Sequence, residues 1–168
     1  KDINVKDYLN ELKLTKLLQE KNWKQADKLL GTLKNEKNIN YNFYKGIVAY
    51  HLKNYNESVR FFEKLLVKPN LKNILSPRQS FKMLTTYSES LYQGNDQKRF
   101  RTNVAALIND LRRSGNKNTQ QALERLEYLF IESLNGEKNV NYDLISLKSK
   151  EFLGEHKESI YKDRVKYL

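Results

Sequence analysis

The sequence predicts an all-α fold of stacked antiparallel helical hairpins. Apolar residues recur at spacings of three and four along nearly the whole chain, the pattern of amphipathic helices. Strand-like alternation does not extend beyond a few residues, and the 168 residues include only two prolines and six glycines. We therefore expect roughly eight or nine helices, arranged in one domain that spans residues 1–168.

Four helices are expected before the first proline. Their apolar stripes predict the ranges 5–18, 23–33, 42–52 and 55–66. Pro69 ends the fourth helix, because its ring cannot continue the hydrogen-bond ladder.

The second half of the chain continues the helical pattern. Ser76, Pro77 and Gln79 form a capping-box sequence that starts a helix. Gly154 is expected to cap the end of a short helix over residues 143–153. The other expected ranges are 77–93, 97–113, 118–134 and 155–167.

The composition excludes several classes of protein. Without cysteine the chain has no disulfide, thiolate metal site or cysteine nucleophile. Its longest apolar run, residues 104–108, is far shorter than the ~20 residues that cross a bilayer. The chain starts at Lys1 rather than methionine, which fits either a boundary or a removed export signal upstream. Together with the absence of cysteine, this start favours an extracytoplasmic, periplasmic location over a cytoplasmic one.

One pattern occurs twice with an offset of 32 residues. A large residue is followed by a small residue three places later and by further large residues at helical spacings. When two antiparallel helices pack closely, the position where their backbones approach must hold a small side chain. Ala26, Ser58 and Gly46 are predicted at such crossing points. The two copies are Trp23, Ala26, Leu30 and Leu33, and Tyr55, Ser58, Phe62 and Leu65.

These residues resemble the tetratricopeptide (TPR) repeat, a helical hairpin of about 34 residues. The best match covers residues 44–66, and residues 7–33 match less fully because Leu14 occupies the small position of the first helix. A third unit has an insertion near Pro69 and Phe100 in place of the family's alanine, and the pattern is degenerate after about residue 115. The matching positions of the best repeat are Gly46, Ala49, Leu52, Asn54, Tyr55, Ser58, Phe62 and Leu65.

The resemblance implies a right-handed superhelix with an inner groove that binds a segment of another protein. The basic clamp of chaperone-binding members is not recognisable. The stripe of Phe43, Ile47 and Tyr50 could equally be covered by a neighbouring helix as core. The residues that the resemblance places in the groove are Phe43, Ile47, Tyr50, His51, Tyr8, Glu89 and Tyr92.

A formal net charge of +11 raises the alternative of a nucleic-acid-binding helical repeat. Lysines are scattered beside acidic and amide residues, which favours a solvated surface over a dedicated polyanion site. The densest basic stretch consists of Lys98, Arg99, Arg101, Arg112 and Arg113.

The favoured function is a protein-interaction scaffold or assembly factor, and its expected partner is a protein or peptide. A structural subunit of a bacterial envelope or motility complex is a further alternative, and frequent Lys, Asn, Ile and Tyr suggest an AT-rich bacterial genome. His51 has no nearby acid or nucleophile at a catalytic spacing, and no phosphate-binding or metal-binding motif is recognisable. We therefore expect no enzyme activity, cofactor, metal or small-molecule substrate.

Overall fold

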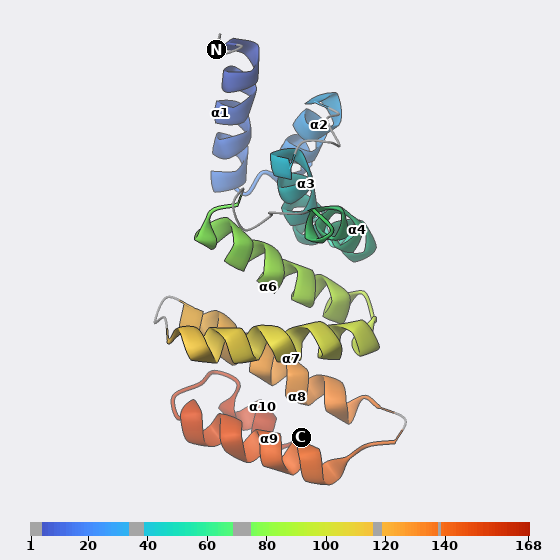
Figure 1. Cartoon of the computed structure of the whole chain (residues 1–168), viewed down its shortest axis with the longest axis vertical. Helices are drawn as coiled ribbons and strands as arrows, with labels where there is room; N and C mark the ends of the chain where they lie inside the picture. Colours follow the sequence, from blue (N-terminus) through green and yellow to red (C-terminus); the bar gives the residue numbers. More distant parts are fainter. Residues whose placement is uncertain (1–4, 34–38, 69–74, 116–118, 138) are drawn as a thin grey trace. The chain divides into compact units, whose positions relative to one another are not determined.

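The computed structural model describes residues 5–33, 39–68, 75–115, 119–137 and 139–168, except for the side chains of 5–8, 39 and 114 (Figure 1). Within these ranges all regular structure is helical. The helices are α1 (Val5–Gln19), α2 (Trp23–Leu33), α3 (Ile39–His51), α4 (Tyr55–Leu66), α6 (Pro77–Gln93), α7 (Gln97–Ser114), α8 (Gln120–Asn135), α9 (Tyr142–Glu155) and α10 (Lys162–Lys166). Two compact units divide the chain, residues 1–90 and 91–168, and their boundary falls within α6. The single-domain assignment stays a prediction.

Most of the predicted helices are confirmed, and three of them have the predicted ends: α2, α4 and α6. The capping box at the start of α6 is also confirmed. The Gln79 N–H donates to the Ser76 hydroxyl over 3.2 Å, and the Ser76 N–H donates to the Gln79 amide oxygen over 3.0 Å. Pro69, the predicted end of the fourth helix, lies outside the described residues.

Two predictions near the C-terminus are wrong. Gly154 does not cap a helix, because α9 continues through it and ends at Glu155. The capping residue is His156, whose N–H donates to the Phe152 carbonyl over 2.8 Å. The predicted last helix is reduced to α10, and turns occupy most of the residues between α9 and α10. His156 is buried there, so the segment following α9 is held against the protein rather than extending as a charged tail.

The turns between successive helices repeat the same geometry at three places. A residue with positive φ follows the helix, at Lys21 (φ 55°), Lys53 (φ 64°) and Asn95 (φ 62°). The next N–H then donates to a carbonyl five residues back, with donor–acceptor distances of 2.8, 2.8 and 2.9 Å. This is the bonding of a Schellman motif, which satisfies carbonyls that a helix end leaves free.

The hairpin of α3 and α4 has the close crossing that the sequence predicts. Ser58 is fully buried, and its hydroxyl donates to the Gly46 carbonyl over 2.8 Å. The Ser90 hydroxyl in turn donates to Ser58 over 2.9 Å. The ring of Phe62 occupies the space where Gly46 lacks a side chain, since a Cβ added there would lie 2.5 Å from the ring. Ala26 is likewise fully buried, in the core shared by α1, α2, α3 and α4.

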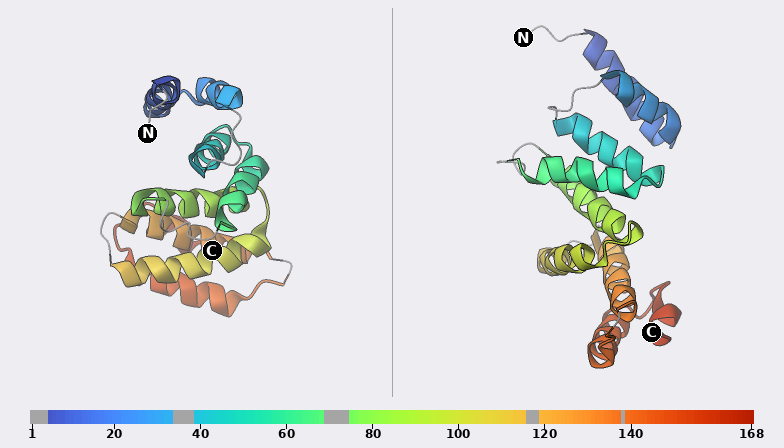
Figure 2. Two further views of the ribbon diagram at one scale, coloured as in Figure 1. Left: turned by 45° about the horizontal axis from the view of Figure 1, so that its top comes forward. Right: turned by 90° about the vertical axis from the view of Figure 1, so that its right-hand side faces the viewer.

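In the second unit, α8 packs against α7 and against α9, and α10 contacts both α8 and α9 (Figure 2). Phe100 and Phe152 are among its largest fully buried side chains. Phe100, where the TPR resemblance predicts alanine, fills the core instead, with its ring 5.1 Å from that of Tyr92. None of the described helices combines the length and the apolar character that crossing a bilayer requires.

Candidate functional site

The first unit gathers four ring side chains from three helices, which we call the aromatic cluster: Trp23, Tyr50, His51 and Tyr55. His51 stacks on Trp23 with ring centroids 3.9 Å apart and planes 8° from parallel. Tyr50 meets His51 edge-on at 5.2 Å and lies 6.0 Å from Tyr55. The Schellman turn at Lys53 places the first residue of α4 near the last residue of α3, and the packing of α2 against α3 brings Trp23 onto His51.

Charged side chains surround the aromatic cluster. Partial burial lowers the pKa of His51, and the positive charges of Lys82 and Lys21 lower it further, against the opposing effect of Glu89. The Tyr50 hydroxyl donates a hydrogen bond to the Glu89 carboxylate. The arrangement offers flat apolar surfaces beside lysine ammonium groups, which suits an acidic or aromatic side chain of a ligand.

The predicted groove residues lie in different environments: some lie at the aromatic cluster and others lie in the core. Tyr50, His51 and Glu89 come together at the aromatic cluster, and His51 is exposed. Phe43 and Ile47 are only 4% and 2% exposed, so in this conformation they belong to the core, the alternative that the sequence left open. The side chain of Tyr8 lies outside the described part of the chain. The ligand contacts of these residues stay predictions.

The predicted groove residue Tyr92 lies in the second unit, where its hydroxyl donates to the Glu132 carboxylate. Tyr128 also donates to Glu132, over 2.7 Å. Burial raises the pKa of Tyr92 well above its ordinary value, and the hydrogen bond to Glu132 raises it further. Within the second unit, the Tyr92–Glu132 hydrogen bond thus links the last turn of α6 to α8. The Tyr50–Glu89 hydrogen bond links α3 to α6 within the first unit.

We expect the raised pKa of Tyr92 to make stability fall in alkali. Because the folded state holds the phenol proton more tightly, its contribution is complete below the unfolded pKa of about 10. The contribution is lost as the pH rises from that value towards the folded pKa. Urea unfolding over this range should show a shallower alkaline loss for Tyr92→Phe than for the wild type. Tyr167→Phe, at a residue 89% exposed, should leave the slope unchanged, and equal slopes for all three proteins would contradict the assignment.

The predicted basic stretch is largely engaged in ion pairs within the second unit. Arg101 pairs with Glu137 at 2.8 Å and donates to the Ser133 carbonyl. Arg99 pairs with Asp96 at 3.2 Å, and Arg112 pairs with two glutamates. Lys98 and Arg113 are exposed. A polyanion-binding role for this stretch stays a prediction, but much of its charge is already balanced.

The excess positive charge lies mainly in the other unit. Residues 1–90 contain 17 lysines and arginines against nine acidic residues, a formal net charge of +8. Residues 91–168 contain 14 against 11, a net charge of +3. The densest basic stretch of the sequence therefore lies in the less basic unit, because acidic residues elsewhere in that unit offset its charge.

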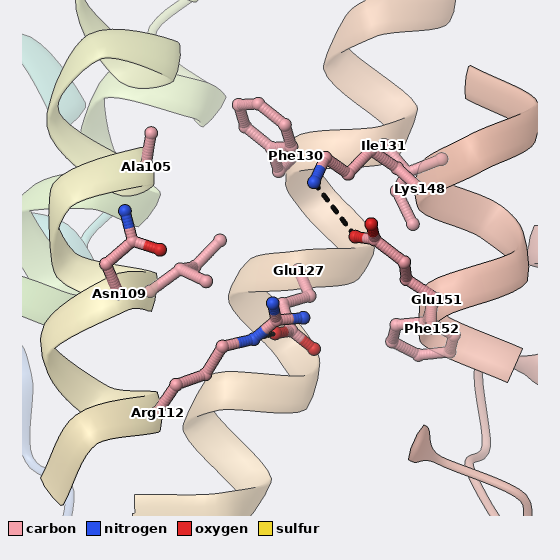
Figure 3. Close-up of a pocket in the computed structure, with 10 residues that line it drawn as sticks. Ala105, Asn109, Arg112, Glu127, Phe130, Ile131, Lys148, Glu151 and Phe152 are labelled. Atoms are coloured by element: carbon pink, nitrogen blue, oxygen red, sulfur yellow. Dashed lines mark hydrogen bonds and ion pairs between the residues drawn. The ribbon is translucent and has the colours of Figure 1, made fainter. Parts of the chain in front are cut away.

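A pocket of about 150 Å³ lies between α7 and α9 with α8 at its base (Figure 3). Its apolar wall includes the buried side chains of Ile108, Ile131 and Phe152. Two ion pairs border it, Arg112 with Glu127 at 2.7 Å and Lys148 with Glu151 at 2.8 Å. This pocket was not predictable from the sequence, because its lining comes from three helices and depends on how they pack.

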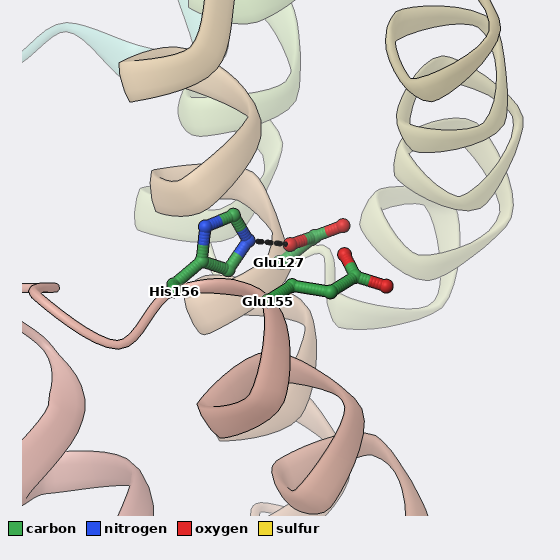
Figure 4. A group of neighbouring side chains, drawn as sticks. All are labelled: Glu127, Glu155 and His156. Carbon is green, nitrogen blue, oxygen red and sulfur yellow. Dashed lines mark hydrogen bonds and ion pairs between the residues drawn. The ribbon is translucent and has the colours of Figure 1, made fainter.

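Next to the pocket, Glu127 and His156 form a buried polar pair (Figure 4). The His156 Nε2 lies 2.6 Å from a Glu127 oxygen, and their side chains are only 3% and 6% exposed. Arg112 bridges Glu127 and the half-exposed Glu155. Nothing in the sequence indicates that Glu127 is buried. A glutamate directly after the apolar Leu126 resembles an ordinary solvated position on a helix.

Glu127, Glu155 and His156 are a conceivable set of metal ligands, because their ligand atoms lie within 4.8 Å of one another. The guanidinium of Arg112, however, already pairs with both carboxylates. A divalent cation would have to displace it and separate His156 from Glu127. The donor set therefore fits an internal ion-pair network better than a metal centre.

The chain has no match among known protein families, curated proteins or solved structures. Its all-α architecture is consistent with helical repeats, and the function rests on its own geometry.

Proposed function

We propose that the protein is an interaction scaffold that binds an acidic segment of a partner protein at the aromatic cluster. The observation that carries this proposal is the stack of His51 on Trp23, beside Tyr50 and next to the charges of Lys21 and Lys82. Aromatic rings offer contact area at little conformational cost and often anchor protein interfaces.

The charge of the first unit supports an acidic partner. A formal net charge of +8 attracts acidic segments and speeds their association. Glu89 lies beside the aromatic cluster, and its carboxylate accepts a hydrogen bond from the Tyr50 hydroxyl. This negative charge disfavours the continuous phosphate backbone of a nucleic acid. Acidic side chains on a peptide can be spaced to reach the lysines and avoid this carboxylate.

The TPR resemblance belongs to the same proposal. The repeated Schellman turns, the small residues at the α3–α4 crossing and the hairpin packing support repeats of this type. We extend the resemblance to a right-handed superhelix, in which first helices of successive hairpins would display Tyr50 and Glu89 to the partner.

Selection of a displayed random peptide library on the whole chain tests this function. We expect enriched peptides that combine Asp or Glu with an aromatic residue. Lys82→Glu and His51→Ala should each weaken the selected peptides at least ~10-fold, or about 1.4 kcal/mol. Lys28→Glu makes the same charge change at an exposed position of α2 outside the cluster and should change affinity little.

Equal weakening by Lys82→Glu and Lys28→Glu would show attraction to net charge alone and contradict a defined site. Failure to enrich any acidic peptide would also contradict the proposal. Labelled single-stranded oligonucleotides should bind weakly. Tight oligonucleotide binding that falls steeply with salt would support the nucleic-acid alternative instead.

A further inference from the structure

The pocket between α7, α8 and α9 has the size of one apolar side chain. A volume of about 150 Å³ accommodates a group as large as a benzene ring. Five of the ten lining residues are apolar, and the other five are polar or charged. Ala105 contributes only a methyl group to one wall, while Phe130 and Ile131 line the α8 side (Figure 3). The pocket therefore has room for a leucine-sized group without displacement of the core.

The charges around the pocket determine which group it accepts. Arg112 is paired with Glu127, and Lys148 is paired with Glu151, so each cation at the pocket has its own carboxylate. A charged ligand group would have to compete with one of these pairs and lose its own hydration. An uncharged apolar group leaves both pairs intact, and the partly exposed Lys148–Glu151 pair borders its contact with the apolar wall.

The mouth of the pocket suits an apolar group that is attached to a peptide. Asn109 is exposed and lines the pocket, and its amide can both donate to and accept from a peptide main chain. Lys148 and Glu151 are about one-third exposed, at 35% and 34%, so the rim is open to solvent. A chain that carries the apolar group can therefore stay outside while its side chain enters.

We propose that this pocket is a second binding site, which takes an uncharged leucine-class side chain of a partner peptide. It lies wholly in the second unit and uses no residue of the aromatic cluster. The inference does not depend on the acidic-peptide function proposed above, and the two can fail separately.

Methyl NMR with N-acetyl-leucine methylamide as the probe tests the site. In the whole chain, the methyl signals of Ile108 and Ile131 should shift saturably, because both side chains line the pocket. The aspartate and lysine derivatives should bind at least ~10-fold more weakly than the leucine derivative. Toluene has no main-chain amide and should also bind more weakly.

Ala105→Leu fills the pocket and should weaken the probe at least ~10-fold. Ala106→Leu is the matched control, since Ala106 is exposed on the same helix and does not line the pocket. If Ala105→Leu fails to fold, Asn109→Leu blocks the mouth from an exposed position and should have the same effect.

Three results would overturn the proposal. One is the absence of any saturable shift in the wild-type protein, and another is a shift that survives in a folded Ala105→Leu or Asn109→Leu variant. The third is binding of toluene or a charged derivative as tightly as the leucine derivative. None of these measurements involves Lys82 or His51, so they do not bear on the aromatic cluster.

Discussion

Glu127→Ala is expected to destabilise the protein by about 3 kcal/mol, because it removes a buried carboxylate and leaves the buried His156 without its partner. Glu127 is 5% exposed and interacts with both Arg112 and His156. Without it, the buried His156 Nε2 loses its partner, and solvent can reach only part of Arg112. Urea unfolding followed by NMR would measure the change for the second unit separately.

The matched control is Glu155→Ala, which removes the other carboxylate paired with Arg112. Glu155 has a side chain 50% exposed and pairs over 3.2 Å, so its loss should cost less than about 1 kcal/mol. Glu127→Gln should fall between the two, since the amide keeps the shape and one hydrogen bond. Equal effects of Glu127→Ala and Glu155→Ala would contradict the buried network.

Double-mutant cycles show whether His156 or Arg112 is the main partner of Glu127. The cost of Glu127→Ala should shrink markedly in a His156→Ala background, because the partner left unsatisfied is then absent. It should shrink less in an Arg112→Ala background, since Arg112 is 35% exposed and has Glu155 as a second partner. The reverse order would show that the ion pair with Arg112 dominates.

Local features were predictable from the sequence because they depend on residues close together in the chain. The ends of α4 follow from its stripe and the turn before it, and the start of α6 follows from Ser76 and Gln79. Ser58 and Gly46 could be predicted as crossing residues because close helix packing has a strict steric requirement. These rules need no knowledge of distant elements.

The candidate sites depend on contacts between distant residues, and most of these were not predictable. Glu127 meets His156 across 29 positions, and each alone resembles a solvated residue. Trp23 meets His51 only through the packing of α2 against α3. The spacing of Phe43 and Ile47 fits both groove-lining and core residues. Neighbouring helices bury them in the core, which the sequence alone could not show.

Gly46→Ala and Gly31→Ala should have opposite effects on stability, although the chemical change is the same and both residues lie in helices. Alanine stabilises a helix interior relative to glycine by about 0.5–1 kcal/mol. A Cβ at Gly31 would meet nothing within 4 Å, so Gly31→Ala should gain this amount. Urea unfolding of the two variants beside the wild type would measure both changes.

At Gly46 the new methyl group would lie 2.5 to 2.9 Å from three ring atoms of Phe62, which is fully buried. The hairpin must separate or the ring must leave its rotamer, so we expect a net loss of about 1–3 kcal/mol. Phe62→Leu should cost less in the Gly46→Ala background than in the wild type, because it removes the ring atoms that the methyl group meets. Additive costs would show that the two helices separate easily, which would contradict the close crossing that Ser58 and Gly46 define.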